Sequence, residues 1–156
     1  MNGAKRQKGD QVMPATARII EVLGGPQAVG QKVRTADQLA RQLRSGLPYA
    51  AFEALVDSLA ISRTELARLL HLPHRTLARR KRDRMIPPVE ADRLYRLARV
   101  FAHALEVFRD RDKAAAWVNR PNHVLGGCTP LSLLDTAIGV DQVDELLGRI
   151  EHGIFS

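Results

Sequence analysis

The 156-residue chain has a single cysteine and no long apolar run. Because Cys128 has no second cysteine to pair with, an intrachain disulfide framework and a multi-cysteine zinc site are both excluded, and a reducing cytoplasm is expected. No apolar run approaches the roughly 20 residues that a membrane-spanning helix needs, and the polar start of the chain is not followed by an apolar signal core. We therefore expect a soluble cytoplasmic protein with no membrane partner.

Aromatic residues are also scarce, at 4% of the chain, although the apolar content of 45% is ordinary for a globular protein. The apolar residues are mainly Leu, Ala, Val and Ile, and no segment shows a convincing strand alternation. The length suits one ordinary domain or two small domains that share a core. The composition therefore predicts an all-α fold.

The net charge of +7 is unevenly distributed along the chain. Residues 1–100 carry a balance of +10, whereas residues 101–156 carry a balance of −3. The basic part suits a polyanion and the acidic part suits a protein partner. The alternative, that both are ordinary solvated helix faces, stays open.

Helical spacing and capping residues predict the following organisation. Residues 1–12 are polar without an apolar period and form a flexible tail. Helices are expected over residues 14–23, 36–45, 48–59, 63–70, 74–84 and 89–108, the last with one apolar stripe. Thr35 and Ser62 each open a capping box, with Gln38 and Glu65 three residues on. Three short helices follow, with Gly139 ending one segment and Asp141 capping the last helix.

Residues 62–82 predict a helix-turn-helix, the arrangement that places a second helix in the major groove of DNA. Ala67 is the small residue where the two helices approach closely. Four leucines hold the helices together: Leu66, Leu70, Leu72 and Leu77. The spacing resembles the Xre-type motif and departs from it at two positions. His71 stands where the turn usually has glycine, and Arg80 stands where such motifs are often apolar.

Six of the eleven residues from 74 to 84 are Arg or Lys, which suits a DNA contact. We predict that the front of the second helix reads bases through His74, Arg75, Thr76 and Arg79. Phosphate contacts are predicted for Arg80, Lys81, Arg82 and Arg84, and for Ser62, Arg63 and Thr64 at the start of the first helix. Because one helix-turn-helix seldom binds tightly alone, a homodimer on operator DNA is expected, with its interface on the 89–108 helix or on the amino-terminal helices.

Residues 117–130 read Trp-Val-Asn-Arg-Pro-Asn-His-Val-Leu-Gly-Gly-Cys-Thr-Pro. With the residues up to Ser156, this string resembles the carboxy-terminal domain of the Xre/MbcA/ParS-type antitoxins. The resemblance covers about 50 residues, from near Ala104 to the end. The positions that match the recurring pattern are Asn119, Arg120, Pro121, Asn122, Gly126, Gly127, Pro130, Leu133, Leu134, Gly139, Arg149, Glu151 and Gly153.

The resemblance implies that residues 13–108 form a helical region with the helix-turn-helix and that residues 109–156 form a toxin-binding domain. In this family the partner is a RES-domain toxin that degrades NAD, and the end of the antitoxin lies against the entrance to the toxin's active site. The implied toxin contacts are Arg149, Glu151, His152, Ile154, Phe155 and Ser156. For Ile154 and Phe155, folding back onto the domain's own core is the alternative.

No enzyme and no cofactor are expected. His71 and His74 are three residues apart, but they span a helix break and lack a carboxylate partner, so no metal site is expected. No nucleophile has an evident base, and residues 24–30 lack the ending of a phosphate-binding loop. The sequence therefore indicates an antitoxin that neutralises a RES-domain toxin and represses its own operon within a toxin–antitoxin complex. The rival hypothesis is a stand-alone helix-turn-helix regulator whose carboxy-terminal domain only dimerises.

Overall fold

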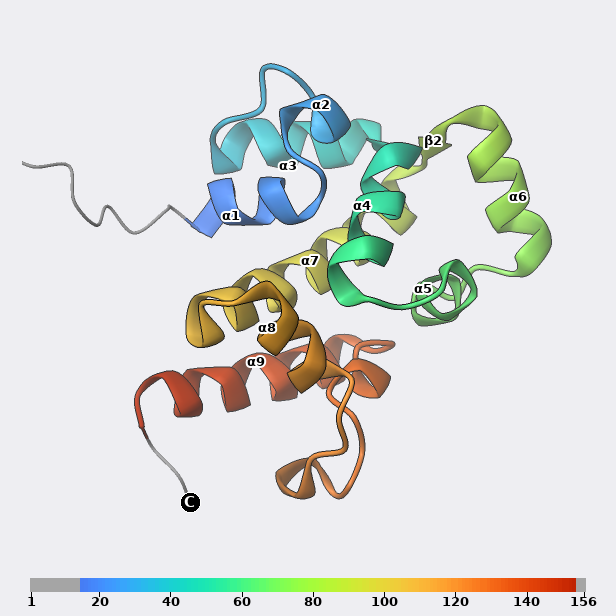
Figure 1. Ribbon diagram of the computed structural model, residues 1–156. Coiled ribbons are helices and arrows are strands. Elements are labelled where there is room, and N and C mark those ends of the chain that lie inside the picture. The colour runs from blue at the N-terminus through green and yellow to red at the C-terminus, as the bar shows by residue number, and fades with distance from the viewer. Residues whose placement is uncertain (1–14, 154–156) are drawn as a thin grey trace, which may run out of the picture.

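The computed structural model describes residues 15–153, so the predicted tail over residues 1–12 lies outside the described residues. The chain is helical almost throughout, which confirms the all-α expectation (Figure 1). The α-helices are α1 (Ala15–Val22), α2 (Pro26–Val29), α3 (Ala36–Ser45), α4 (Tyr49–Leu59), α5 (Arg63–Leu69), α6 (His74–Asp83), α7 (Pro88–Phe108), α8 (Arg111–Val118) and α9 (Ala137–Glu151). Two 3₁₀ turns, η1 (His123–Leu125) and η2 (Leu131–Leu133), lie between α8 and α9.

The long helix α7 is the centre of the molecule. Helices α1, α3, α4, α8 and α9 all pack against it (Figure 1). The predicted stripe is buried at Leu94, Leu97 and Phe101, but α7 also buries residues on both flanks of that stripe, Val100 and Ala102. The sequence predicted one apolar face for α7, but the buried part of the helix is wider than that face because several helices pack around it.

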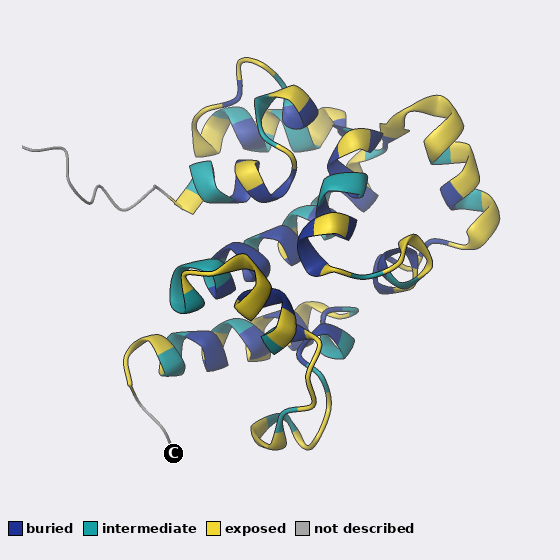
Figure 2. Cartoon of the chain, viewed as in Figure 1, coloured by how far each residue is buried: buried dark blue, intermediate teal, exposed yellow. Residues whose placement is uncertain are grey.

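A single hydrophobic core runs through the described chain. It extends from Ile19 in α1 to Leu147 in α9 and includes residues of the helix-turn-helix such as Leu66 and Leu77. Figure 2 shows the buried residues concentrated along α7 and on the faces of the helices that cover it. The helix-turn-helix and the carboxy-terminal helices are therefore joined through α7.

A short antiparallel ladder, which the sequence did not predict, joins two distant segments. Strand β1 (Leu47–Pro48) pairs with β2 (Met85–Ile86), and Leu47 lies opposite Ile86. Gly46, at a φ of +98°, approaches so closely that a Cβ would collide with the carbonyl oxygen of Ile86. Since two-residue strands have no alternation to detect, no periodic pattern announces them. The ladder fixes where α6 ends and α7 begins.

One of the two predicted capping boxes needs correction. Thr35 and Gln38 form the complete capping box, as predicted. Ser62 accepts a hydrogen bond from the Glu65 amide at 3.1 Å, but the Glu65 carboxylate binds Arg68, so the second box is only half formed. The start of α3 is therefore capped by two reciprocal hydrogen bonds, whereas the start of α5 is capped by the Ser62 hydroxyl alone.

The predicted start of the last helix is also wrong. Helix α9 is capped by Thr136, whose hydroxyl accepts from the Gly139 amide at 3.0 Å, and Asp141 lies within the helix. Gly139 does not end a segment. It lies in the first turn of α9, where only glycine fits because a Cβ would collide with the backbone oxygen of Leu133.

No helix within residues 15–153 is long and apolar enough to cross a bilayer.

Candidate functional site

Helices α5 and α6 are joined by a tight turn that holds His71 in the left-handed conformation, with φ of +57°. The turn is closed by the Leu72 amide, which donates to the Ala67 oxygen at 2.8 Å. A side chain other than glycine is strained there by about 1–2 kcal/mol. The His71 ring lies 2.6 Å from the backbone oxygen of Asp135, directly before α9. The turn therefore forms with histidine, and the ring ties it to the carboxy-terminal helices.

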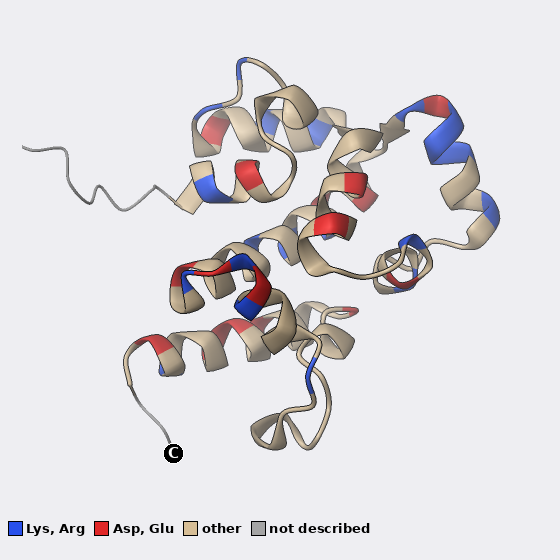
Figure 3. Cartoon of the chain, viewed as in Figure 1, with Lys and Arg blue, Asp and Glu red and all other residues tan. Residues whose placement is uncertain are grey.

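Helix α6 projects from the body and carries most of its cations on open surface (Figure 3). Leu77 is its only buried residue. Ala78, expected to face inward, is exposed. A helix with one buried residue leaves nearly its whole circumference free for a partner.

The structure brings most of the predicted DNA-contacting residues together on α6 and directly after it. The exposed members are His74, Arg75, Arg79, Lys81, Arg82 and Arg84, and Thr76 is partly buried. Arg82 lies 3.8 Å from Asp83. In the described part of the chain, Arg75, Arg79, Lys81 and Arg84 form no ion pair. Four cations are therefore available to an external anion.

Arg80 is the exception among the cations of α6, and the structure does not place it at the predicted phosphate-facing surface. Its Nε and Nη2 donate to the two carboxylate oxygens of Glu90 in α7, at 2.7 and 2.8 Å. The side chains are only 17% and 12% exposed. The hydrogen bonds with Glu90 raise the pKa of Arg80. Position 80, which is often apolar in such motifs, points inward, and here Glu90 neutralises the charge of Arg80.

At the start of α5, two of the three predicted phosphate donors already have partners. Ser62 caps the helix, and the Nε of Arg63 lies 2.7 Å from Glu53, which also accepts a hydrogen bond from the Tyr49 hydroxyl. Burial and the Glu53 carboxylate raise the pKa of Tyr49 to about 12. Thr64 is exposed. Because Arg63 is 57% exposed, its pair with Glu53 is weak and exchangeable.

The predicted toxin contacts lie at the end of α9, as far as the structure describes them. Arg149 is exposed and pairs with Glu145 at 2.9 Å. His152 is exposed, and Glu151 binds the ring of His103 in α7. Ile154, Phe155 and Ser156 lie outside the described residues. Arg149 and His152 are therefore open to a partner, whereas Glu151 fastens the helix end to the body.

His103 links α7 to α9 at two points, which the sequence did not predict. Its Nδ1 lies 2.8 Å from Asp144 and its Nε2 lies 3.0 Å from Glu151. Both partners are carboxylate acceptors, so the two ring nitrogens donate to them at the same time only in the protonated imidazole. Burial lowers the pKa of His103, but the two carboxylates raise it by more, so the pKa lies above the usual 6.5. Asp144 and Glu151 are seven residues apart, which places both carboxylates on the same face of α9, where one histidine of α7 contacts both.

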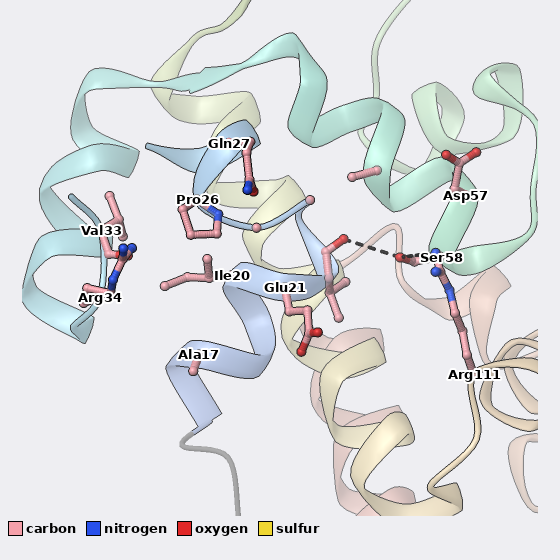
Figure 4. Close-up of a pocket in the computed structure, with 14 residues that line it drawn as sticks. Ala17, Ile20, Glu21, Pro26, Gln27, Val33, Arg34, Asp57, Ser58 and Arg111 are labelled. Atoms are coloured by element: carbon pink, nitrogen blue, oxygen red, sulfur yellow. Dashed lines mark hydrogen bonds between the residues drawn. The ribbon is translucent and has the colours of Figure 1, made fainter. Parts of the chain in front are cut away.

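A separate pocket of about 590 Å³ lies between α1, α2 and α4 (Figure 4). Arg111 reaches it from α8 and donates to the Ser58 hydroxyl at 3.2 Å, and that hydroxyl donates to the Val22 oxygen at 3.4 Å. Among the described residues that line it there is no histidine and no cysteine. Residues 15–153 also contain no cluster of three metal-ligating side chains.

Comparison with known proteins assigns both halves of this architecture. Residues 38–99 match the antitoxin Xre-like helix-turn-helix domain, and residues 103–153 match the antitoxin Xre/MbcA/ParS C-terminal toxin-binding domain. The fold and the two matches define the class of a helix-turn-helix antitoxin. Both segments in which the sequence resembled this class are thereby confirmed.

Curated relatives that match between about half and four fifths of the chain agree. The antitoxin Xre of Yersinia enterocolitica is 36% identical over 129 residues, covering 71% of this chain and 87% of that protein. The antitoxin Xre of Photorhabdus laumondii is 35% identical over 130 residues, with 82% and 88% covered. The antitoxin Xre of Pseudomonas putida is 40% identical over 83 residues, with 53% and 52% covered. The chain belongs to the Xre antitoxin family, which favours a regulatory role over an enzymatic one.

Proposed function

We propose that this antitoxin neutralises a RES-domain, NAD-degrading toxin by covering its active site, and that it represses its own operon by binding operator DNA. The match of residues 103–153 to a toxin-binding domain carries the first part. The exposed cations of α6, which have no ion-pair partner within the described chain, support the second. Neutralisation by steric blockade needs no catalytic group on the antitoxin, and no cofactor.

For DNA recognition, α6 lies in the major groove with its amino-terminal end toward the bases. His74, Arg75, Thr76 and Arg79 occupy that end and the next turn, and an arginine can bridge two acceptors of guanine. Phosphate contacts come from Lys81, Arg82, Arg84 and the start of α5 (Ser62, Arg63 and Thr64). Arg80 is left out because its Nε and Nη2 already donate to the Glu90 carboxylate, which holds the side chain against α7.

The working form on DNA is a homodimer within a larger toxin–antitoxin complex, because two recognition helices on adjacent half-sites multiply the affinity of one. Residues 13–108 serve DNA binding and residues 109–156 serve toxin binding. Contact with the toxin comes from the exposed Arg149 and His152, from Glu151 at the end of α9, and from Ile154, Phe155 and Ser156 beyond it.

The experiment is co-expression of the full chain with the adjacent reading frame, followed by purification of the complex and measurement of cellular NAD. We expect a co-purifying RES-domain protein, and NAD preserved only when the full chain is present. A chain that lacks residues 154–156 should protect NAD less well and bind operator DNA as before. Full protection by the truncated chain would remove the blocking role from its end. An absent RES-like neighbour would favour the stand-alone regulator.

A further inference from the structure

Between Arg120 and Asp135 the chain has no charged residue, although charged residues make up 26% of the sequence. The first part of this segment, residues 121–128, is a loop that projects from the body below α9 (Figure 1). Most of it is exposed, including Pro121, His123 and Cys128 (Figure 2). A projecting loop without charge is unusual on a protein surface and is typical of interface centres, where charged residues are depleted.

The 121–128 loop is held in one shape by its own hydrogen bonds. The Asn122 amide donates to the Cys128 oxygen at 2.9 Å, and the Gly127 amide donates back to the Asn122 oxygen at 2.9 Å. The Asn122 side chain accepts from the Val124 amide at 2.9 Å. Because these bonds close the loop at its base and order its tip, a partner would meet a preformed surface, and little conformational entropy would be lost on binding.

Packing within the chain does not explain this conformation. Gly126 and Gly127 have φ of +71° and +84°, yet a Cβ on either would meet no atom of residues 15–153 within 4 Å. Val124 is 46% exposed, and only Leu125 packs against the core. The two glycines therefore serve the path of the loop, and that path presents Val124 to the outside.

We infer that the 121–128 loop is a docking element for the toxin, separate from the end of α9, and that Val124 enters an uncharged apolar hollow on the toxin. This inference rests on the proposed function. The loop lies inside the segment that matches a toxin-binding domain, residues 103–153. It stands far from α6 in Figure 1, and it lacks the cations that a DNA backbone requires. The toxin is therefore the occupant that its position and chemistry fit.

The test compares Val124→Glu with the control Val89→Glu, using the full chain and the toxin purified from the co-expressed complex. Val89 is 66% exposed but lies in the segment that matches the helix-turn-helix domain. In Val124→Glu, the new carboxylate would be buried against the toxin without a partner, and binding should weaken about tenfold or more, a loss typical of changes at the centre of an interface. Val89→Glu should bind as the unchanged chain does. Equal melting temperatures for the three proteins show that folding is intact.

A second measurement uses Cys128, the single cysteine, which is exposed at the base of the loop. Its alkylation by a maleimide should slow in the complex with the unchanged chain. If the unchanged chain does not bind the toxin, the proposed function fails and the loop inference fails with it. If it binds, and Val124→Glu and the Cys128 alkylation rate show no effect, only the loop inference is overturned. A change in self-association of free Val124→Glu, measured by sedimentation, would assign the loop to contacts between copies and would also overturn it.

Discussion

Arg80 of α6 and Glu90 of α7 form a two-point ion pair, with both nitrogen–oxygen distances below 2.9 Å and both side chains largely buried. Helix α6 buries only Leu77, so this pair is its main polar attachment to the body. The residue that the sequence placed among the phosphate contacts thus orients the helix that carries the remaining cations.

Replacing Glu90 with Ala should lower the free energy of unfolding by about 2 kcal/mol, because it leaves a partly buried guanidinium without its partner. The control is Asp92→Ala, which removes the exposed pair of Asp92 with Arg96 and should cost about 0.5 kcal/mol or less. Urea unfolding monitored by circular dichroism measures both. Equal losses for the two variants would show that the Arg80–Glu90 pair does not anchor α6.

The double variant Arg75→Ala with Arg79→Ala should weaken operator binding by about 1–3 kcal/mol per arginine and relax specificity at the bases they contact. The matched control is Arg68→Ala, an exposed arginine of α5 that pairs with Glu65. Fluorescence anisotropy at several salt concentrations gives the affinity and its salt dependence. An unchanged affinity and salt slope in the double variant would refute α6 as the recognition helix.

The link of His103 to α9 should make stability depend on pH. Because the folded-state pKa of His103 is raised above 6.5, its stabilising contribution is fully present below about pH 6.5 and is lost as pH rises through the folded pKa. The free energy of unfolding should therefore decrease between pH 6 and pH 8. His103→Gln should abolish this part of the decrease, since glutamine does not titrate. Urea unfolding at pH 6 and pH 8 gives the free energy of unfolding of both proteins. An equal decrease in the unchanged chain and in His103→Gln would contradict the role of His103.

Two glycines of α9 should respond to alanine with opposite signs. Gly139→Ala places a Cβ against the backbone oxygen of Leu133, which cannot move without shifting η2, so we expect a loss of about 2 kcal/mol or more. Gly148→Ala has open space and should stabilise the helix by about 0.5–1 kcal/mol. Thermal unfolding measures both effects, and we expect a lower melting temperature for Gly139→Ala and a higher one for Gly148→Ala. A tolerated Gly139→Ala would show that η2 does not pack tightly on α9.

The bounds of the helices could be predicted to within a residue or two for most of the chain, including α5, α6 and α7. Capping residues and helical periodicity act within one or two turns, so the sequence carries them directly. The same holds for the two family motifs, whose residues follow one another in fixed order and were confirmed by the matches to residues 38–99 and 103–153. The start of α9 was missed because Gly139 has the same local appearance whether it ends a helix or allows a close approach.

Residues far apart in the sequence were paired only by the tertiary structure. Nothing local shows that Arg80 meets Glu90, that His103 lies between Asp144 and Glu151, or that His71 reaches the oxygen of Asp135. Each contact depends on how helices pack around α7, which is a property of the whole core and not of any short segment. Sequence therefore determined the helices, the charge of α6 and the family, whereas packing decided which charged groups are free to meet DNA or toxin and which hold the fold together.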